Sequence, residues 1–212
     1  MGNVVYFVEL LFIPLIAFLI IYLKSKGKGH ICLKSGYDMS RELLNANNLN
    51  DMYIVEVKNK FGDHYDFEQK VVRLSTNVYN GNSVYANVIA LYIAMKAVLN
   101  GKQDYYLKIR NSISGIINFL TYGVLVIFLI GMFVSEQMVI FAILLLLLIY
   151  LYYLFCMYGT YIIVTQIKKL EFADKQDISK SLWLLYFWDF ASLIINLLNV
   201  VTNFTDNLKN KR

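Results

Sequence analysis

The sequence has 212 residues, of which 58% are hydrophobic and only 17% are charged. A soluble domain of this size needs more charged residues to cover its surface, so this composition excludes an ordinary soluble protein. The formal net charge is +5, but the basic residues lie mostly beside apolar segments, and no basic–aromatic face accompanies them. Nucleic-acid binding is therefore not expected, whereas contact with a lipid bilayer is.

The apolar segments predict a mainly α membrane protein with three to four transmembrane helices. A helix needs about 20 apolar residues to cross a hydrocarbon core of about 30 Å. Three segments clearly meet this requirement, namely residues 1–23, 111–135 and 137–165. Pro14 in the first segment is expected to kink that helix or to end a turn. Residues 182–204 either cross the membrane or lie along its inner face, because Asp189 in their middle is costly at the bilayer centre.

Basic residues predict how the chain is oriented in the cell membrane. Four lysines follow the first apolar segment, at positions 24, 26, 28 and 34, and no basic side chain precedes it. Basic residues remain preferentially on the cytoplasmic side, so residues 24–110 are expected to form a cytoplasmic domain and residues 166–181 a cytoplasmic connection. The same lysines stand where a signal peptide would have small residues, so the first segment is interpreted as an uncleaved anchor. A disulfide between Cys32 and Cys156 is not expected in this setting.

The predicted cytoplasmic domain has the pattern of a small α+β unit. Residues 38–47 have apolar positions at helical spacing, and Asp38 is suited to cap the start of this helix. The other elements follow in chain order: a strand over 52–57, a polar connection over 58–66, a strand over 70–74, an Asn-Gly turn at 80–81 and an apolar helix over 83–99. The domain therefore lies between the first and second predicted spans.

Short motifs in and around this domain occur in an order and spacing that is typical of one family. They are RELLNANNL at residues 41–49, DHYD at 63–66, VRLS at 72–75, VYNG at 78–81 followed by Ser83, LKIR at 107–110 and NF at 118–119. In these motifs the chain resembles the neutral zinc metallopeptidase family of small bacterial membrane proteins. The resemblance covers most of the chain and implies a zincin-like fold for the predicted cytoplasmic domain.

The sequence departs from this family at the metal site. The family's helix carries a His-Glu-x-x-His motif, whose two His ligate Zn²⁺ while the Glu polarises the bound water. Counted from the VYNG motif, these positions hold Tyr92, Ile93 and Lys96, and the family's third ligand position falls near Ile163. None of these four side chains can do the work of a zinc ligand or of the catalytic Glu. The resemblance therefore implies that zinc, although expected for the family, is not expected in this chain.

Other residues are weak substitutes for the missing ligands. The chain has two histidines, and His30 lies beside the boundary of the first predicted span. His64 lies between Asp63 and Asp66 on the predicted polar connection. Three possible ligands within four residues of a loop are more often a hydrogen-bonded turn than a metal site. His64, Asp63 and Asp66 are accordingly only weak metal candidates.

The scaffold beside the missing site is retained. In zinc peptidases of this general type, a strand beside the metal helix pairs with an extended peptide through backbone hydrogen bonds, and this pairing does not need zinc. The resemblance therefore implies that Arg73, Ser75, Tyr79 and Asn80 are candidates for peptide binding. The alternative is that these residues only fix the fold of the domain.

The leading hypothesis is a catalytically inactive homologue of a membrane zinc metallopeptidase. Such a protein would bind a membrane protein, a peptide or an active relative without cutting it. One alternative is an active metallopeptidase with substitute ligands, and another is a structural or protective membrane protein. The metal ligands and the catalytic Glu are all missing, whereas the surrounding motifs match the family, and this combination favours the first hypothesis.

Overall fold

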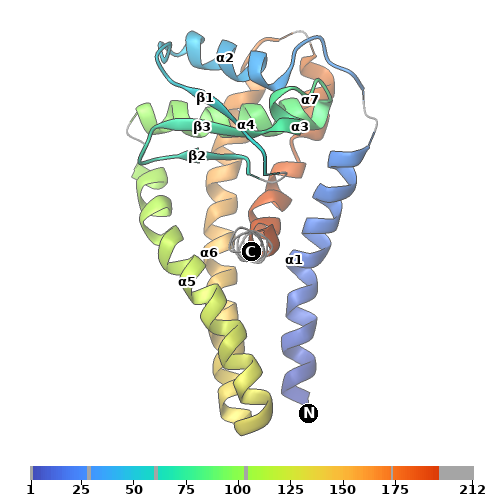
Figure 1. Ribbon diagram of the computed structural model, residues 1–212, viewed down its shortest axis with the longest axis vertical. Helices are drawn as coiled ribbons and strands as arrows, with labels where there is room; N and C mark the ends of the chain where they lie inside the picture. Colours follow the sequence, from blue (N-terminus) through green and yellow to red (C-terminus); the bar gives the residue numbers. More distant parts are fainter. Residues whose placement is uncertain (1, 28–29, 60–61, 103–104, 173, 196–212) are drawn as a thin grey trace, which may run out of the picture. The chain divides into compact units, whose positions relative to one another are not determined.

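A computed structural model describes residues 2–27, 30–59, 62–102, 105–172 and 174–195 of the chain (Figure 1). Its elements are mostly α-helices, with one small three-stranded sheet. The chain divides into two compact units. The helical unit comprises Met1–Ile21, Ser112–Met157 and Phe187–Arg212, and the sheet unit comprises Tyr22–Asn111 and Tyr158–Tyr186.

Three long helices cover the first three predicted spans, namely α1 (Gly2–Lys26), α5 (Tyr105–Val134) and α6 (Glu136–Lys168). Among the described residues, four helices are long and apolar enough to cross a membrane, and these three are among them. Helices of this length and composition indicate an integral membrane protein. The fourth is α4 (Val84–Gly101), but 72% of its most apolar 18-residue stretch is buried inside the protein.

The last predicted apolar segment begins with a bend. Helix α7 (Lys175–Ser181) and the helix Leu184–Ile195 are bent by 49° relative to each other. Taken together, they are long and apolar enough for a broken membrane span or a re-entrant loop. Asp189, the costly residue of this segment, is only 2% exposed. The remainder of the predicted segment, residues 196–204, lies outside the described residues.

A hydrogen bond in the helical unit explains how α1 continues through its proline. Pro14 has no backbone N–H, so the carbonyl group of Leu10, four residues earlier, lacks its usual helical donor. The hydroxyl group of Tyr150 in α6 donates to that carbonyl oxygen. Phe7 and Phe128 stack nearby in the same apolar core, with ring centroids 3.7 Å apart. The polar group that proline leaves unpaired is thus satisfied by a neighbouring helix, as a lipid-facing helix requires.

The sheet unit has three strands where the sequence predicts two. The strand order is β1–β3–β2, in which β1 (Ile54–Val57) is parallel to β3 (Val71–Ser75), and β2 (His64–Asp66) is antiparallel to it. Strand β2 lies in the segment expected to be a polar connection, and that expectation is wrong. Tyr65 is buried between exposed His64 and partly buried Asp66, but three alternating residues are too short a pattern to detect.

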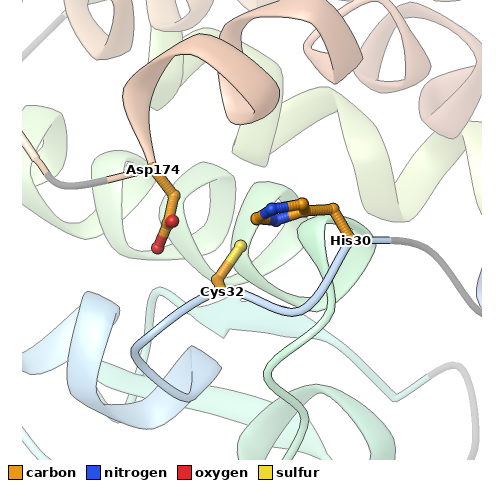
Figure 2. A group of neighbouring side chains, drawn as sticks. All are labelled: His30, Cys32 and Asp174. Carbon is orange, nitrogen blue, oxygen red and sulfur yellow. The ribbon is translucent and has the colours of Figure 1, made fainter.

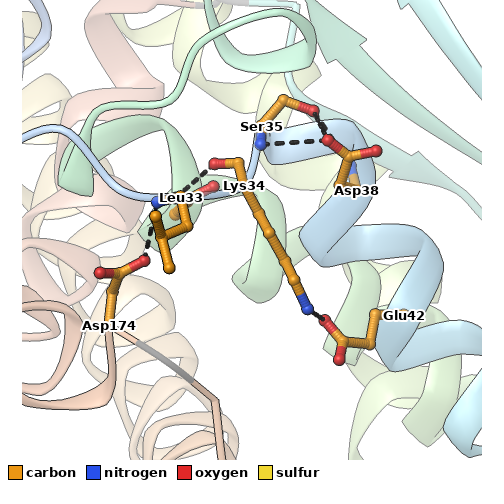
Figure 3. A network of polar contacts seen from close by, with 7 residues as sticks. Leu33, Lys34, Ser35, Asp38, Glu42 and Asp174 are labelled. Carbon is orange, nitrogen blue, oxygen red and sulfur yellow. Dashed lines mark hydrogen bonds and ion pairs between the residues drawn. The ribbon is translucent and has the colours of Figure 1, made fainter.

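Helix α2 (Gly36–Ala46) starts earlier than predicted because Ser35, not Asp38, is its N-cap residue. The Ser35 Oγ accepts a hydrogen bond from the backbone N–H of Asp38, whose carboxylate accepts one from the backbone N–H of Ser35 (Figure 3). This reciprocal arrangement is a capping box. The buried residues of α2 then pack along α4, where the hydroxyl of Ser40 donates to the carbonyl oxygen of Ala90 at 3.2 Å.

Helix α4 is the centre of the sheet unit. It is capped by Ser83, whose Oγ accepts from the backbone N–H of Ala86 at 3.2 Å, and nearly all of its side chains are buried. The short helix α3 (Thr76–Tyr79), helices α2 and α7, and strands β2 and β3 all contact it. The apolar content of α4 is therefore used for packing within this unit.

Two glycines of the sheet unit lie where backbone segments approach closely. A Cβ atom on Gly36 would lie 2.1 Å from the carbonyl oxygen of Val78, and one on Gly81 would lie 2.1 Å from the carbonyl oxygen of Asn77. The backbone N–H of Gly36 also donates to the carbonyl oxygen of Gly81 at 2.8 Å. Neither glycine has a positive φ, so close approach rather than backbone freedom excludes a side chain.

We expect Gly81→Ala to lower the midpoint of thermal unfolding of the full-length protein in detergent. The added Cβ atom would clash with the carbonyl oxygen of Asn77, four residues earlier, and overpacking of this kind costs about 1–3 kcal/mol. Gly101→Ala is the matched control, because its Cβ atom would lie 3.6 Å from the side chain of Leu49, an ordinary contact. Equal midpoints for the two variants would contradict this account of Gly81.

Candidate functional site

The four positions that the count from the VYNG motif assigns to the family's metal site lie on α4 and α6. Tyr92 and Ile93 have no exposed surface, Ile163 is 1% exposed, and all three lie in the sheet unit. The hydroxyl oxygen of Tyr92 lies 3.0 Å from that of Thr160, which is also fully buried, so the two groups form a hydrogen bond between α4 and α6. A tyrosine whose hydroxyl group is paired with Thr160 and two buried apolar side chains therefore occupy three of the four positions.

Lys96, at the position of the family's second His, covers the ring of Tyr92. Its Nζ lies 3.9 Å from the ring centroid, within the range of a cation–π interaction. Zinc in proteins is bound by thiolate, imidazole and carboxylate groups, and an ammonium group repels a divalent cation. Tyr92, Ile93, Lys96 and Ile163 therefore do not fit the zinc ion that the family's helix holds.

Asp63 of the DHYD motif is hydrogen-bonded to Ser75 of the VRLS motif. Its carboxylate oxygens accept hydrogen bonds from the backbone N–H of Ser75 at 2.7 Å and from the Ser75 hydroxyl at 3.0 Å. Both residues are buried. Burial raises the pKa of Asp63 to about 7, although the hydrogen bonds from Ser75 lower it. Asp63 and Ser75 thus fix the end of β3 against the residue before β2.

The other candidates for peptide binding also have partners within the sheet unit. The guanidinium group of Arg73 donates to Asp66 at 3.2 Å, the side chain of Asn80 donates to Glu56 at 3.3 Å, and the ring of Tyr79 packs on Tyr37. Strand β3, which carries Arg73, is paired on both sides. Its backbone is therefore already used by the sheet, and an added peptide strand would need an edge strand instead.

The weak metal candidates Asp63, His64 and Asp66 point to separate partners. Asp63 is turned towards Ser75, and the Nδ1 of exposed His64 lies 2.7 Å from the carbonyl oxygen of Gly62. The carboxylate of Asp66 accepts from two backbone N–H groups of the following turn, which lowers its pKa. Among the described residues, these three do not form a group with converging metal-binding atoms.

A different set of three side chains does converge, namely His30, Cys32 and Asp174 (Figure 2). One potential ligand atom of each lies within 4.8 Å of the other two. Cys32 is buried, Asp174 is partly buried and His30 is exposed. His30 and Cys32 belong to the segment after α1, and Asp174 is the N-cap residue of α7.

Backbone contacts hold this cluster in place. The backbone N–H of Cys32 donates to the carbonyl oxygen of Asn82 at 2.7 Å, just before α4 begins. The backbone N–H of Leu33 donates to the carboxylate of Asp174 at 3.0 Å (Figure 3). The two chain segments that carry the cluster are therefore attached to each other and to the start of α4.

The cluster is rich in negative charge. The Nδ1 of His30 lies 3.7 Å from a carboxylate oxygen of Asp177, which adds a second acidic group beside Asp174. Burial raises the pKa of the Cys32 thiol, the charges of Asp174 and Asp177 raise it further, and a hydrogen bond with the side chain of Asn87 lowers it. The free thiol is accordingly the stable form near neutral pH.

This cluster is not predicted by the sequence. Leu33 and Asp174, which touch, are 141 positions apart in the chain. The only local signal was the spacing of His30 and Cys32 with a single residue between them, which is too short to predict a site by itself. The contact between the two segments depends on how α7 folds back onto α4.

The long apolar helices and the small sheet unit define the chain as an integral membrane protein. Comparison with known families shows to which family it belongs. Residues 10–157 match the family described as "Putative neutral zinc metallopeptidase", and the chain belongs to this family. The resemblance drawn from the DHYD, VRLS and VYNG motifs is thereby confirmed.

A curated relative of the chain is "Putative membrane protease YugP" of Bacillus subtilis (strain 168). The two sequences are 31% identical over 103 residues, which is 49% of this chain and 46% of that protein. The chain therefore spans about half the length of the curated relative it matches. No solved structure matches the chain.

The buried carboxyl group of Asp63 predicts a pH dependence of stability. Its pKa of about 7 lies above the ordinary value of 3.8, so between these values the folded protein binds more protons than the unfolded chain. The contribution of Asp63 to stability therefore rises as the pH falls from about 7 towards about 4. Asp63→Asn has a neutral side chain of the same shape and removes this titration.

The measurement compares thermal unfolding of the wild type and Asp63→Asn, both at full length in detergent. We expect the midpoint of the wild type to rise relative to that of the variant when the pH is lowered from about 8 to about 5. A difference between the two proteins that stays constant over this range would contradict the burial of Asp63.

Proposed function

We propose that this protein is a catalytically inactive member of its family, anchored in the cell membrane, that binds a membrane protein or a peptide without cutting it. The observation that carries the proposal is the buried contact between Tyr92 and Thr160, with the ammonium group of Lys96 over the Tyr92 ring. Tyr92 and Lys96 stand at positions where the count from the VYNG motif would put the family's two histidines, and neither a tyrosine in a buried hydrogen bond nor a lysine supplies the zinc-bound water of such an enzyme.

The free edge of β1 is the surface proposed for this binding. Within the described sheet, β1 pairs only with β3, so its other edge is open to an added strand. Tyr53 and Val55 are 72% and 39% exposed beside this edge, and exposed apolar residues on an unpaired strand favour pairing with another chain. The carbonyl oxygen of Tyr53 accepts from the N–H of Val72 in β3, so by alternation the backbone groups of Glu56 point to the open edge.

The proposed orientation places the sheet unit in the cytoplasm. Lys24 and Lys26 lie in the last turn of α1, and Lys168 lies in the last turn of α6. All three belong to the sheet unit, and basic residues at the ends of spans favour the cytoplasmic side. The partner is then a cytoplasmic peptide or the cytoplasmic part of a membrane protein.

Site-specific photocrosslinking in intact membranes tests this function. A photoreactive residue at Val55 is expected to give a discrete crosslinked product, and one at exposed Asn45 on α2 is not. Glu56→Pro removes the backbone N–H that the added strand would bind and should weaken the product roughly 2- to 12-fold, because one hydrogen bond contributes about 0.5–1.5 kcal/mol. Glu56→Ala is the matched control, since it keeps this N–H and also loses the contact with Asn80. No product at Val55, or equal products in both Glu56 variants, would refute strand addition.

A metallopeptidase with substitute ligands is the second candidate, because His30, Cys32 and Asp174 converge on one point. Three protein ligands leave a coordination position of zinc open for water, which is the arrangement of catalytic zinc sites. Hydrolysis of quenched-fluorescent peptides that is lost on chelation and in Cys32→Ser would establish this candidate and exclude the inactive one. Absence of hydrolysis by the zinc-loaded protein would exclude the candidate.

A further inference from the structure

His30, Cys32 and Asp174 form a side-chain cluster away from the positions that the family motif assigns to zinc. We propose that this cluster binds a zinc ion, which fastens the segment after α1 to the N-terminus of α7. Zinc is the ion that this donor set favours, because it accepts thiolate, imidazole and carboxylate ligands in one tetrahedral site. Hard cations such as Mg²⁺ and Ca²⁺ prefer oxygen ligands alone.

The distances fit a zinc site after a small movement. Atoms bound to one tetrahedral zinc lie about 3.5 Å apart, because the bonds to zinc are about 2.0–2.3 Å long. The three ligand atoms already lie within 4.8 Å of one another. The side chain of His30 is 60% exposed, so its ring is free to turn towards the other two. A surface hollow beside His30, which Asp177 also lines, exposes this side of the cluster to solvent.

The surroundings of the cluster also favour a cation. Asp177, 3.7 Å from the His30 ring, is placed to orient that ring, as carboxylates beside zinc-bound histidines commonly do. Asn87 is fully buried beside Cys32, and its Oδ1 accepts no hydrogen bond from the described residues. An unsatisfied buried oxygen is costly, so the site carries acceptor groups in excess of the donors that reach them.

The positive charges around these acceptors belong to lysines, of which Lys24 lines the same hollow as His30 and Asp177. Lys180 lies 3.9 Å from the carboxylate of Asp177, whereas the ammonium group of nearby Lys34 is bound to Glu42 at 2.5 Å (Figure 3). The carboxylate of Asp174 accepts a neutral backbone N–H from Leu33. A divalent ion would therefore bring charge compensation to the thiolate and carboxylate together, and binding would release the proton of Cys32.

Metal analysis of the full-length protein in detergent tests the site. After incubation with Zn²⁺ and removal of free ions, we expect about one zinc per chain, in line with three protein ligands. His30→Ala, Cys32→Ser and Asp174→Asn should each weaken zinc binding by at least about tenfold, since even residues around a zinc site affect affinity 10- to 100-fold. The chain supplies its own matched controls: His64→Ala and Cys156→Ser change its other histidine and its other cysteine and should bind zinc like the wild type.

A second readout identifies the sulfur ligand without depending on the folding of a variant. Co²⁺ added to the wild type should produce the charge-transfer absorption of a cobalt–thiolate bond, and bound Zn²⁺ should protect Cys32 from alkylation. Stoichiometric zinc that persists in both His30→Ala and Cys32→Ser, or a wild type that binds neither ion, would overturn the proposal. The binding function proposed above is decided separately by the crosslinks at Val55.

Discussion

The hydroxyl groups of Tyr92 and Thr160 lie 3.0 Å apart, and neither residue has any exposed surface. A hydrogen bond contributes about 0.5–1.5 kcal/mol to stability, and this one is shielded from water on both sides. Their bond joins α4, the central helix of the sheet unit, to the end of α6 in the same unit. The ammonium group of Lys96 lies over the Tyr92 ring, and Ile93 and Ile163 on the same two helices are buried.

The motifs that the chain shares with its family have structural roles that do not depend on zinc. The DHYD and VRLS motifs persist because Asp63 and Ser75 hold β3 against the residue before β2, a role that needs no metal. The VYNG motif ends in Gly81, whose backbone lies too close to Asn77 for any side chain. Retention of these motifs is therefore explained by packing and hydrogen bonding. Membership of the family and the absence of zinc ligands on α4 are compatible for this reason.

Much of the fold follows from the sequence, because long apolar segments and the helical spacing around Leu43 and Leu44 are strong local signals. Strand β2 was missed because it has only three residues, and the capping role of Ser35 was assigned to Asp38 three positions later. The metal positions on α4 were predicted by counting from a motif. The cluster of His30, Cys32 and Asp174 could not be predicted, because a contact between such distant segments depends on the tertiary fold.

The contact between Tyr92 and Thr160 is most directly tested by a double-mutant cycle on the unfolding free energy of the full-length protein. Tyr92→Phe and Thr160→Val each remove one hydroxyl group and nearly preserve the volume of the side chain. If the two hydroxyl groups are hydrogen-bonded to each other, the two changes should be non-additive, with a coupling of about 0.5–3 kcal/mol. Effects that add to within about 0.3–0.5 kcal/mol would show that the two groups do not interact, and would contradict the buried bond between α4 and α6.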